Sequence, residues 1–172
     1  PFGETSYFAN FMKVPGTPVI DGVIDPGEYN ITAPMKFNKE YQVRLGDTIC
    51  FNDNAYELLN ELKGQVKQYA VTNGTKVAQD RKLKLSGLID IFDAVFISEE
   101  LGVEKPGAGF FEKVWEKIGR YNPDEVMIIG DSLTSDMKGG NNAGILCCWY
   151  NSKGAVNDKG IRIDFEIDDL QK

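Results

Sequence analysis

The stretch that decides the fold is Gly130-Asp131-Ser132-Leu133-Thr134-Ser135-Asp136, which follows the apolar run Val126-Met127-Ile128-Ile129. An apolar run of this length that ends at a glycine is typical of a buried strand in a parallel sheet. Asp131 and Asp136 then fall at the carboxyl end of that strand, where open α/β sheets bind their ligands. Oxygen ligands on a tight loop suit a hard cation such as Mg²⁺. The same residues also fit a plain strand–turn–helix junction in which Asp131 or Ser132 caps the following helix.

Short apolar runs alternate with amphipathic segments from about residue 52 onward. The runs predict strands at 69–71, 94–97, 126–129, 145–150 and 165–167. The amphipathic segments predict helices from Asn52 or Asp53 to Lys63, and over 76–86, 108–118 and 135–143. This alternation predicts βαβ units and therefore an α/β fold, a three-layer Rossmann-like arrangement with helices on both faces of a parallel sheet.

Residues 1–40 differ in composition and periodicity from the rest of the chain. They hold five of the seven prolines and show little helical periodicity. We expect an irregular segment there, with a short strand or hairpin over 18–24. The chain therefore divides into an irregular N-terminal segment, 1–40, and a core, 41–172.

The composition excludes several classes of function. The chain has 172 residues, of which 42% are hydrophobic and 26% charged, as in an ordinary globular domain. Its net charge of −7 argues against a surface for nucleic acid or for anionic membranes. A small phosphorylated substrate remains compatible, because a phosphate pocket needs only one or two local cations and backbone amides.

The chain has no histidine, and this restricts the chemistry further. Ser-His-Asp and Cys-His mechanisms are excluded within the chain, so carboxylates, lysines, hydroxyls and backbone amides must act instead. The three cysteines, Cys50, Cys147 and Cys148, lack the spacing of a disulfide framework or a zinc site. They favour a reducing cytoplasm. No apolar run approaches the roughly 20 residues of a membrane span.

Polar groups also follow the first two predicted strands. Thr72-Asn73-Gly74 comes after the strand at 69–71 and offers a hydroxyl, an amide and a close backbone approach to a phosphoryl oxygen. An ordinary capped turn explains the same three residues. Lys105 follows the strand at 94–97 and is either a point charge for a phosphate or a solvated surface lysine.

Taken in this order, Thr72, Lys105 and the pair Asp131 and Asp136 resemble the second, third and fourth motifs of the haloacid dehalogenase (HAD) superfamily of phosphohydrolases. The resemblance covers residues 41–172. Four segments are most similar to the noncanonical pyrimidine 5′-nucleotidase branch, namely VTNGT, SEELGVEKP, IIGDSLTSDMKGGNNAG and CWYN. In that branch, residues 41–64 would be the end of a helical cap and its return to the core.

The resemblance implies a Mg²⁺-dependent hydrolase of phosphate monoesters, acting on small phosphometabolites and among them nucleoside 5′-monophosphates. Thr72 and Lys105 would be catalytic, and both would bind the phosphoryl group together with Asn73 and Gly74. Asp131 would ligate Mg²⁺, and Asp136 would do so directly or through water. The resemblance implies no nucleic-acid or membrane partner and leaves an oligomer open.

The first motif of the superfamily, DxDxT, has no match before Thr72. Two degenerate registers are conceivable, one at 19–24 with Asp21 as the second aspartate, and one at 44–48 with Arg44 in the nucleophile position. Neither register can form an aspartyl-phosphate. The alternative function is therefore a catalytically inactive HAD-like binding or scaffold domain, or an incomplete fragment.

The missing motif also has a structural consequence. In this superfamily its strand lies between the strands that here end at Thr72 and Gly130. Without it two strand edges stay unpaired, and each unsatisfied buried backbone group costs about 1–3 kcal/mol. Residues 1–40 or another chain must fill that place, or the chain folds differently. The segment PVIDGVIDPGEYN at 18–30 also resembles the opening strand of family-9-like carbohydrate-binding modules, which suggests a third function, carbohydrate interaction.

Overall fold

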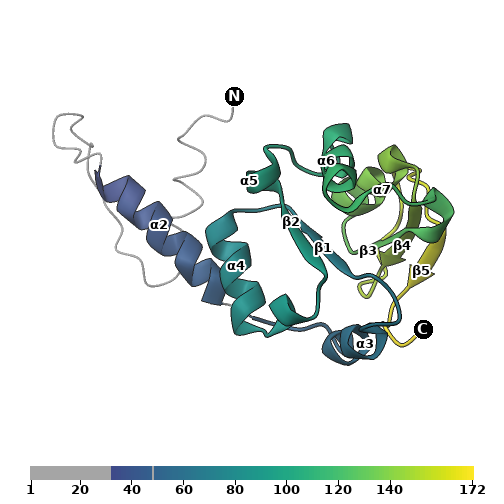
Figure 1. Ribbon diagram of the computed structural model, residues 1–172, viewed down its shortest axis with the longest axis horizontal. Helices are drawn as coiled ribbons and strands as arrows, with labels where there is room; N and C mark the ends of the chain where they lie inside the picture. The colour runs from purple at the N-terminus through teal and green to yellow at the C-terminus, as the bar shows by residue number, and fades with distance from the viewer. Residues whose placement is uncertain (1–31, 48) are drawn as a thin grey trace. The chain divides into compact units, whose positions relative to one another are not determined.

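The structure, a computed structural model, describes residues 32–47 and 49–172 (Figure 1). The expected strand or hairpin at 18–24, and with it the register around Asp21, lies outside the described residues. The chain divides into two compact units, residues 1–37 and 38–172. The first described helix is α2 (Thr32–Asp47); it corrects the expectation of an irregular segment up to residue 40 and excludes one of the two conceivable registers of the missing motif. Residues 32–40 are helical rather than irregular, and Arg44 lies in a helix, so the register at 44–48 is not a strand.

The described strands form two parallel sheets. In the first, β1 (Tyr69–Thr72) pairs with β2 (Ala94–Ile97). In the second, the order is β3 (Met127–Gly130), β4 (Leu146–Tyr150) and β5 (Phe165–Ile167). Figure 1 shows the two sheets as separate groups of arrows. The parallel α/β arrangement confirms the expected fold class.

The order of the strands leaves one edge of β1 and one edge of β3 without a strand partner among the described residues. In each sheet the strands follow in chain order, β1–β2 and β3–β4–β5, so β1 and β3 are each the first strand of their sheet. Because both series start at an unpaired edge, the two edges are those expected from the missing first motif. The described part of the sheet is thus split rather than continuous.

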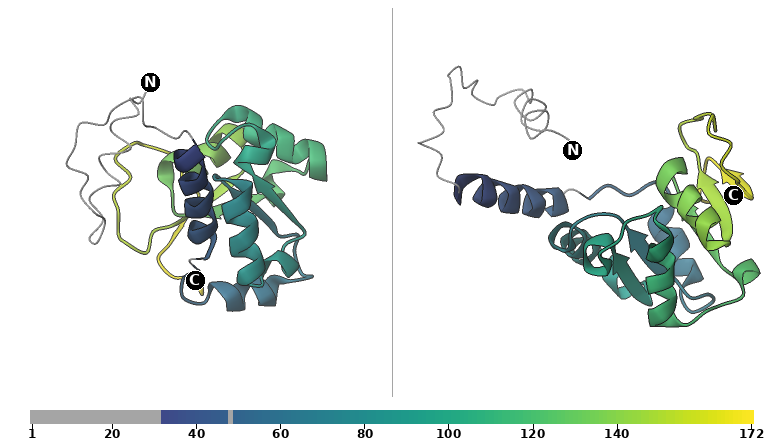
Figure 2. Two further views of the ribbon diagram at one scale, coloured as in Figure 1. Left: turned by 90° about the vertical axis from the view of Figure 1, so that its left-hand side faces the viewer. Right: turned by 90° about the horizontal axis from the view of Figure 1, so that it is seen from above.

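Helices occupy the connections between the strands, as Figures 1 and 2 show. The helices of unit 38–172 are α3 (Ala55–Leu62), α4 (Lys76–Leu85), α5 (Ser98–Leu101), α6 (Ala108–Ile118) and α7 (Lys138–Ala143), with short turns η1 (Leu88–Asp90), η2 (Pro123–Glu125) and η3 (Leu133–Met137). No helix among residues 32–47 and 49–172 is long and apolar enough to cross a membrane.

Side-chain caps begin α4 and η3 but not α3. The Thr75 hydroxyl accepts from the backbone N–H of Ala78 and begins α4. The Ser132 hydroxyl accepts from Ser135 N and begins η3. The region expected to be one helix, 135–143, therefore consists of two consecutive elements, η3 and α7. The expected cap of α3 at Asn52 or Asp53 is wrong, because α3 follows Asn54, which is left-handed at φ 63° and makes no side-chain cap.

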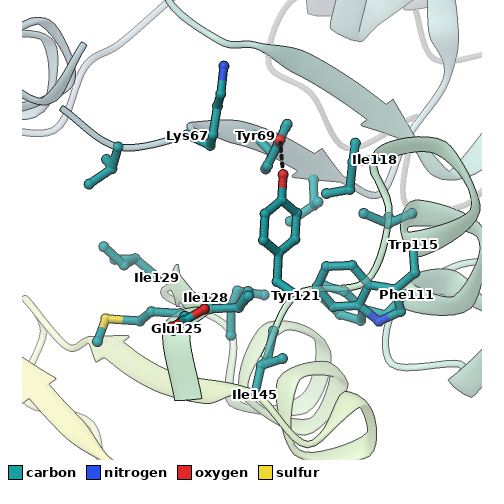
Figure 3. Close-up of a pocket in the computed structure, with 15 residues that line it drawn as sticks. Lys67, Tyr69, Phe111, Trp115, Ile118, Tyr121, Glu125, Ile128, Ile129 and Ile145 are labelled. Carbon is teal, nitrogen blue, oxygen red and sulfur yellow. Dashed lines mark hydrogen bonds between the residues drawn. The ribbon is translucent and has the colours of Figure 1, made fainter. Parts of the chain in front are cut away.

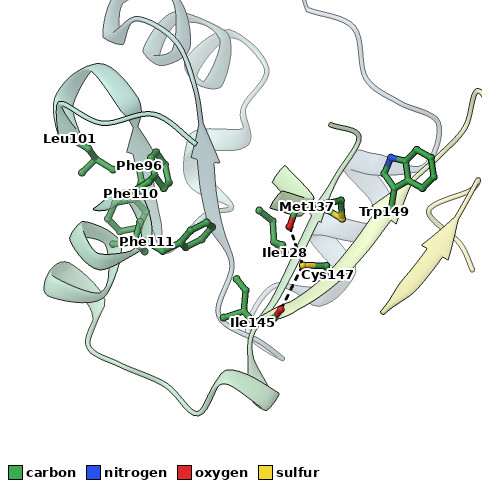
Figure 4. Packing of buried hydrophobic residues seen from close by; sticks show 10 residues of the cluster. Phe96, Leu101, Phe110, Phe111, Ile128, Met137, Ile145, Cys147 and Trp149 are labelled. Atoms are coloured by element: carbon green, nitrogen blue, oxygen red, sulfur yellow. Dashed lines mark hydrogen bonds between the residues drawn. The ribbon is translucent and has the colours of Figure 1, made fainter. Parts of the chain in front are cut away.

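The hydrophobic core gathers against α6 and β4. Figure 4 shows Phe96, Leu101 and Phe110 in one group, with Ile128 and Cys147 in another. The helix α6 supplies three buried side chains, Phe110, Phe111 and Val114, at the spacing of one helical face. Cys147 and Cys148 are buried free thiols, in keeping with their apolar surroundings, and burial raises the pKa of Cys148.

The close packing of α7 on the second sheet depends on Gly140. A Cβ at this position would lie 2.6 Å from both Cys147 Sγ and Ile128 Cγ2, inside the core. Such a distance is far below van der Waals contact, so helix and sheet would have to separate.

We therefore predict that Gly140→Ala lowers the free energy of unfolding by about 1–3 kcal/mol, the usual cost of overpacking a core. The matched control is Gly109→Ala in α6, where the added Cβ would meet Val103 Cγ2 at an ordinary 3.9 Å. The control gains helix propensity and should be neutral or stabilising. Urea unfolding measures both variants, and equal stability of the two would contradict the packing described for α7.

Candidate functional site

The loops that follow β1, β2 and β3 meet at one edge of the fold. Thr72 ends β1, Ser98 follows β2 and Asp131 follows β3. Because β1 is parallel to β2, their carboxyl ends lie at the same edge. Side-chain hydrogen bonds from Asn73 and Lys105 connect the loops, and these bonds define the candidate site.

The Asn73 side chain connects the loop after β1 to the loop that contains Lys105, through both its amide nitrogen and its amide oxygen. Its Nδ2 donates to the carbonyl of Lys105 at 2.9 Å, and its Oδ1 accepts from the backbone N–H of Lys105 at 2.9 Å. The same Nδ2 lies 3.3 Å from Ser135 Oγ in η3. The Asn73 side chain thus positions the neighbouring loops, and a role for it in holding a phosphoryl group stays a prediction.

Lys105 is buried, so its interpretation as a solvated surface lysine is wrong. Its side chain is 5% exposed, and its Nζ donates to Asp136 Oδ1 and to the carbonyl of Val71, both at 2.7 Å. The ammonium also lies 5.9 Å from the centroid of the Phe110 ring. A buried charge of this kind needs a partner of opposite sign, which Asp136 provides.

Asp136 lies against the carboxyl end of β3. Its Oδ2 accepts from the backbone N–H of Ser132 at 3.2 Å. A Cβ on Gly130 would lie 2.5 Å from the same oxygen, so only glycine leaves room for the carboxylate. Since Lys105 Nζ contacts both Val71 of β1 and Asp136, the ammonium lies between the carboxyl ends of β1 and β3.

Asp131 presents the second carboxylate of this edge to solvent. Its side chain is exposed and bonds to no described residue, while its backbone carbonyl accepts from Trp149 Nε1 at 3.0 Å. The oxygen donors of Asp131 and Asp136 have the chemistry that Mg²⁺ prefers. No group of three or more His, Cys, Asp or Glu side chains that could hold a metal occurs in the described part of the chain. Two carboxylates therefore make an incomplete ligand set, and Asp136 shares its charge with Lys105.

Thr72 and Gly74 complete the loop after β1. The Thr72 hydroxyl is half-buried and lies 3.3 Å from the carbonyl of Asn73. The backbone N–H of Gly74 donates to Ser98 Oγ at 3.0 Å, so this amide is engaged within the protein. Their roles in binding a phosphoryl group stay predictions.

Sequence reasoning missed Ser98, Ser135 and Trp149 as residues that shape the site. Ser98 bonds a residue 24 positions away, Ser135 bonds one 62 positions away, and Trp149 bonds one 18 positions away. No local pattern signals such contacts, because they arise only when the strands are placed side by side.

Known proteins are similar to this chain in sequence and in fold. The sequence model of the haloacid dehalogenase-like hydrolases matches residues 16–144. The pyrimidine 5′-nucleotidase PynA of Streptococcus pneumoniae is 39% identical over 128 residues, which cover 74% of this chain and 53% of PynA. The pyrimidine 5′-nucleotidase YjjG of Escherichia coli is 33% identical over 139 residues, covering 81% of this chain and 62% of YjjG.

A solved structure of this family is also similar to the chain. The HAD-hydrolase YfnB from Bacillus subtilis, solved bound to magnesium, superimposes with a TM-score of 0.75 at 36% identity, covering 79% of this chain and 60% of YfnB. The chain spans about half to three fifths of the length of the relatives it matches.

Because the Asn73 amide bonds both the backbone N–H and the carbonyl of Lys105, removing this side chain should destabilise the fold substantially. We expect Asn73→Ala to lower the free energy of unfolding by about 1–3 kcal/mol, because it leaves the backbone N–H and carbonyl of Lys105 without these partners. The control is Asn60→Ala, where an exposed amide donates only to the carbonyl of Tyr56 in its own helix, and where we expect a change within about 0.5 kcal/mol. Urea unfolding compares them, and similar losses would show that Asn73 does not hold the loops together.

Proposed function

Because the chain belongs to the haloacid dehalogenase-like hydrolase family, we propose that its site binds the phosphoryl group of small phosphate monoesters and serves their hydrolysis. Nucleoside 5′-monophosphates are the proposed substrates, since PynA and YjjG are both pyrimidine 5′-nucleotidases. The proposed cofactor is Mg²⁺, with Asp131 and Asp136 as its protein ligands.

One observation supports this function above the others, namely the position of the Lys105 ammonium between the ends of β1 and β3. Phosphoryl transfer depends on positioning and on neutralising the charge of the transferring group more than on elaborate covalent chemistry. A cation that is fixed and largely buried attracts this negative charge more strongly than a cation in water does. The Lys105 ammonium is fixed in such a buried place. It donates to the Val71 carbonyl, and Thr72 is the next residue along the chain.

In the proposed reaction Lys105 would neutralise phosphoryl oxygens, and the Thr72 hydroxyl would donate to one of them after turning from the Asn73 carbonyl. Asp131, exposed and without a bonded partner among the described residues, would hold the cation. Mg²⁺, when bound, would supply further neutralisation of the phosphoryl charge. Asn73 would keep the loop of Lys105 in register with the loop of Thr72.

A second candidate function is binding without turnover. The described residues place only Asp131 and Asp136 at this edge, and Asp136 is bound to Lys105. A covalent phosphoryl intermediate needs a further, free carboxylate at the end of a strand between β1 and β3. In this second candidate function the described residues would hold phosphate and metal without cleaving the ester by themselves.

Asp131→Asn tests the metal site. We expect this change to weaken Mg²⁺ binding about tenfold or more, because it removes one formal charge from an ion with few protein ligands. Asp124→Asn in η2 is the control, since Asp124 is exposed and lies outside the site. Titration calorimetry with Mg²⁺ measures both, and an unchanged affinity of Asp131→Asn would overturn the assignment.

Turnover separates the two functions. With Mg²⁺ present, we expect this chain alone to hydrolyse p-nitrophenyl phosphate and nucleoside 5′-monophosphates about 10³-fold or more below a complete enzyme, the usual loss when a nucleophile is missing. Fast hydrolysis that Asp131→Asn abolishes would instead show a nucleophile within the chain. Asp21, Asp25 and Asp47 would then be the first candidates to replace.

A further inference from the structure

Trp149 contacts the candidate site from the interior of the second sheet. The residue is 3% exposed and belongs to the buried hydrophobic cluster in Figure 4. A buried indole needs an acceptor for its N–H, which is its only polar group. Trp149 Nε1 donates to the backbone carbonyl of Asp131 at 3.0 Å. The acceptor is therefore a residue of the candidate site and not one of the core.

The register of the second sheet explains how the indole reaches the loop after β3. Trp149 of β4 pairs with Gly130, which is the last residue of β3. Asp131 is the next residue along the chain, so its carbonyl is the first one beyond the strand. The Trp149 side chain thus binds the loop at the point where the ladder between β3 and β4 stops.

A second hydrogen bond holds the same peptide unit from its other side. The unit between Asp131 and Ser132 contains one carbonyl, which accepts from Trp149, and one N–H, which donates to Asp136 Oδ2 at 3.2 Å. A trans peptide unit is planar, and its C=O and N–H point in opposite directions. Two bonds at opposite ends of the plane fix its orientation, and with it the backbone torsion that follows the Cα of Asp131.

The Asp131 carboxylate depends on this backbone for its position. Its side chain is exposed and bonds to no described residue, whereas the Asp136 carboxylate is held by Lys105 and by the N–H of Ser132. A ligating group binds tightly only when the surrounding structure holds it close to the productive geometry. For Asp131, the bonds to its peptide unit are the contacts that can do so.

We propose that Trp149 is a positioning residue for the Asp131 carboxylate, whose direction its indole N–H sets by fixing the Asp131–Ser132 peptide plane. The inference rests on the proposed function, because it takes Asp131 as a ligand of Mg²⁺. Trp149 itself touches neither the metal nor the substrate in this proposal. The indole N–H, and not only the bulk of the ring, then governs the affinity for Mg²⁺.

Replacement of the Trp149 indole by an isostere in the full chain tests this role. In Trp149→benzothienylalanine a sulfur atom takes the place of the N–H in a bicyclic ring of similar shape, so the core stays filled while the donor is lost. We expect the affinity for Mg²⁺ in titration calorimetry to fall about tenfold, as it does when a group that orients a metal ligand is removed. An unchanged affinity would overturn the proposal.

The matched control is the same replacement at Trp115, the other of the two tryptophans. Trp115 lies in α6, with its ring centroid 6.2 Å from that of Phe111, and lines a pocket of about 390 Å³ (Figure 3). Its indole N–H bonds to no described residue, so the loss of this donor should leave the affinity for Mg²⁺ unchanged. Equal losses at both positions would contradict a specific role of Trp149.

The indole N–H resonances give a readout that core packing alone does not move. Nuclear magnetic resonance of the full chain should show one N–H cross-peak for each tryptophan, and the Trp115 replacement identifies the peak of Trp149. Mg²⁺ should shift the Trp149 peak saturably, with the midpoint found by calorimetry, because its N–H is bonded to the peptide unit of the ligating residue. A Trp149 peak that stays in place while Mg²⁺ binds would contradict the proposal.

Asp131→Asn distinguishes a failure of this inference from a failure of the proposed function. If Asp131→Asn weakens Mg²⁺ binding and Trp149→benzothienylalanine does not, Asp131 is a ligand and only the role of Trp149 is overturned. If neither change weakens binding, the metal assignment is overturned together with the inference. Weaker binding in both variants, with the Trp115 control unchanged, is the result that we expect.

Discussion

The site depends on the contacts of the Lys105 ammonium, because they join the two sheets where no strand of residues 32–47 and 49–172 joins them. It reaches the Val71 carbonyl at the end of β1 and the Asp136 carboxylate at the end of β3, each at 2.7 Å. The charge is largely withdrawn from water, so its attraction to Asp136 is stronger than in an exposed pair. Removal of either partner would leave a buried charge without compensation.

The same arrangement organises the described part of the site. The side chains of Asn73 and Ser98 bond backbone groups of neighbouring loops. The Asp136 carboxylate accepts from the backbone N–H of Ser132, and Gly130 leaves room for it. No strand of the described residues lies between the two sheets, and Lys105 contacts residues of both sides there. A buried cation is therefore in place at the carboxyl ends of β1 and β3, and our proposal assigns it to the charge of a phosphoryl group.

The fold class could be predicted from the sequence because each strand is a short apolar run bounded by turn residues. The expected strand at 94–97 and helix at 108–118 have the observed bounds, and the unpaired edges followed from the missing motif. The start of α3 could not be predicted, because Asn54 adopts a left-handed conformation that its neighbours do not signal. The burial of Lys105 and the double use of Asn73 could not be predicted either, since both depend on residues more than 30 positions away.

A double-mutant cycle between Lys105 and Asp136 tests the central claim most directly. Urea unfolding of Lys105→Met, Asp136→Asn and the double variant measures how far the two side chains act together. If the buried pair joins the two sheets, each single change should be strongly destabilising, and the double variant should lose about 1–3 kcal/mol less than the sum of the two. Strictly additive losses, with no coupling between Lys105 and Asp136, would contradict this account.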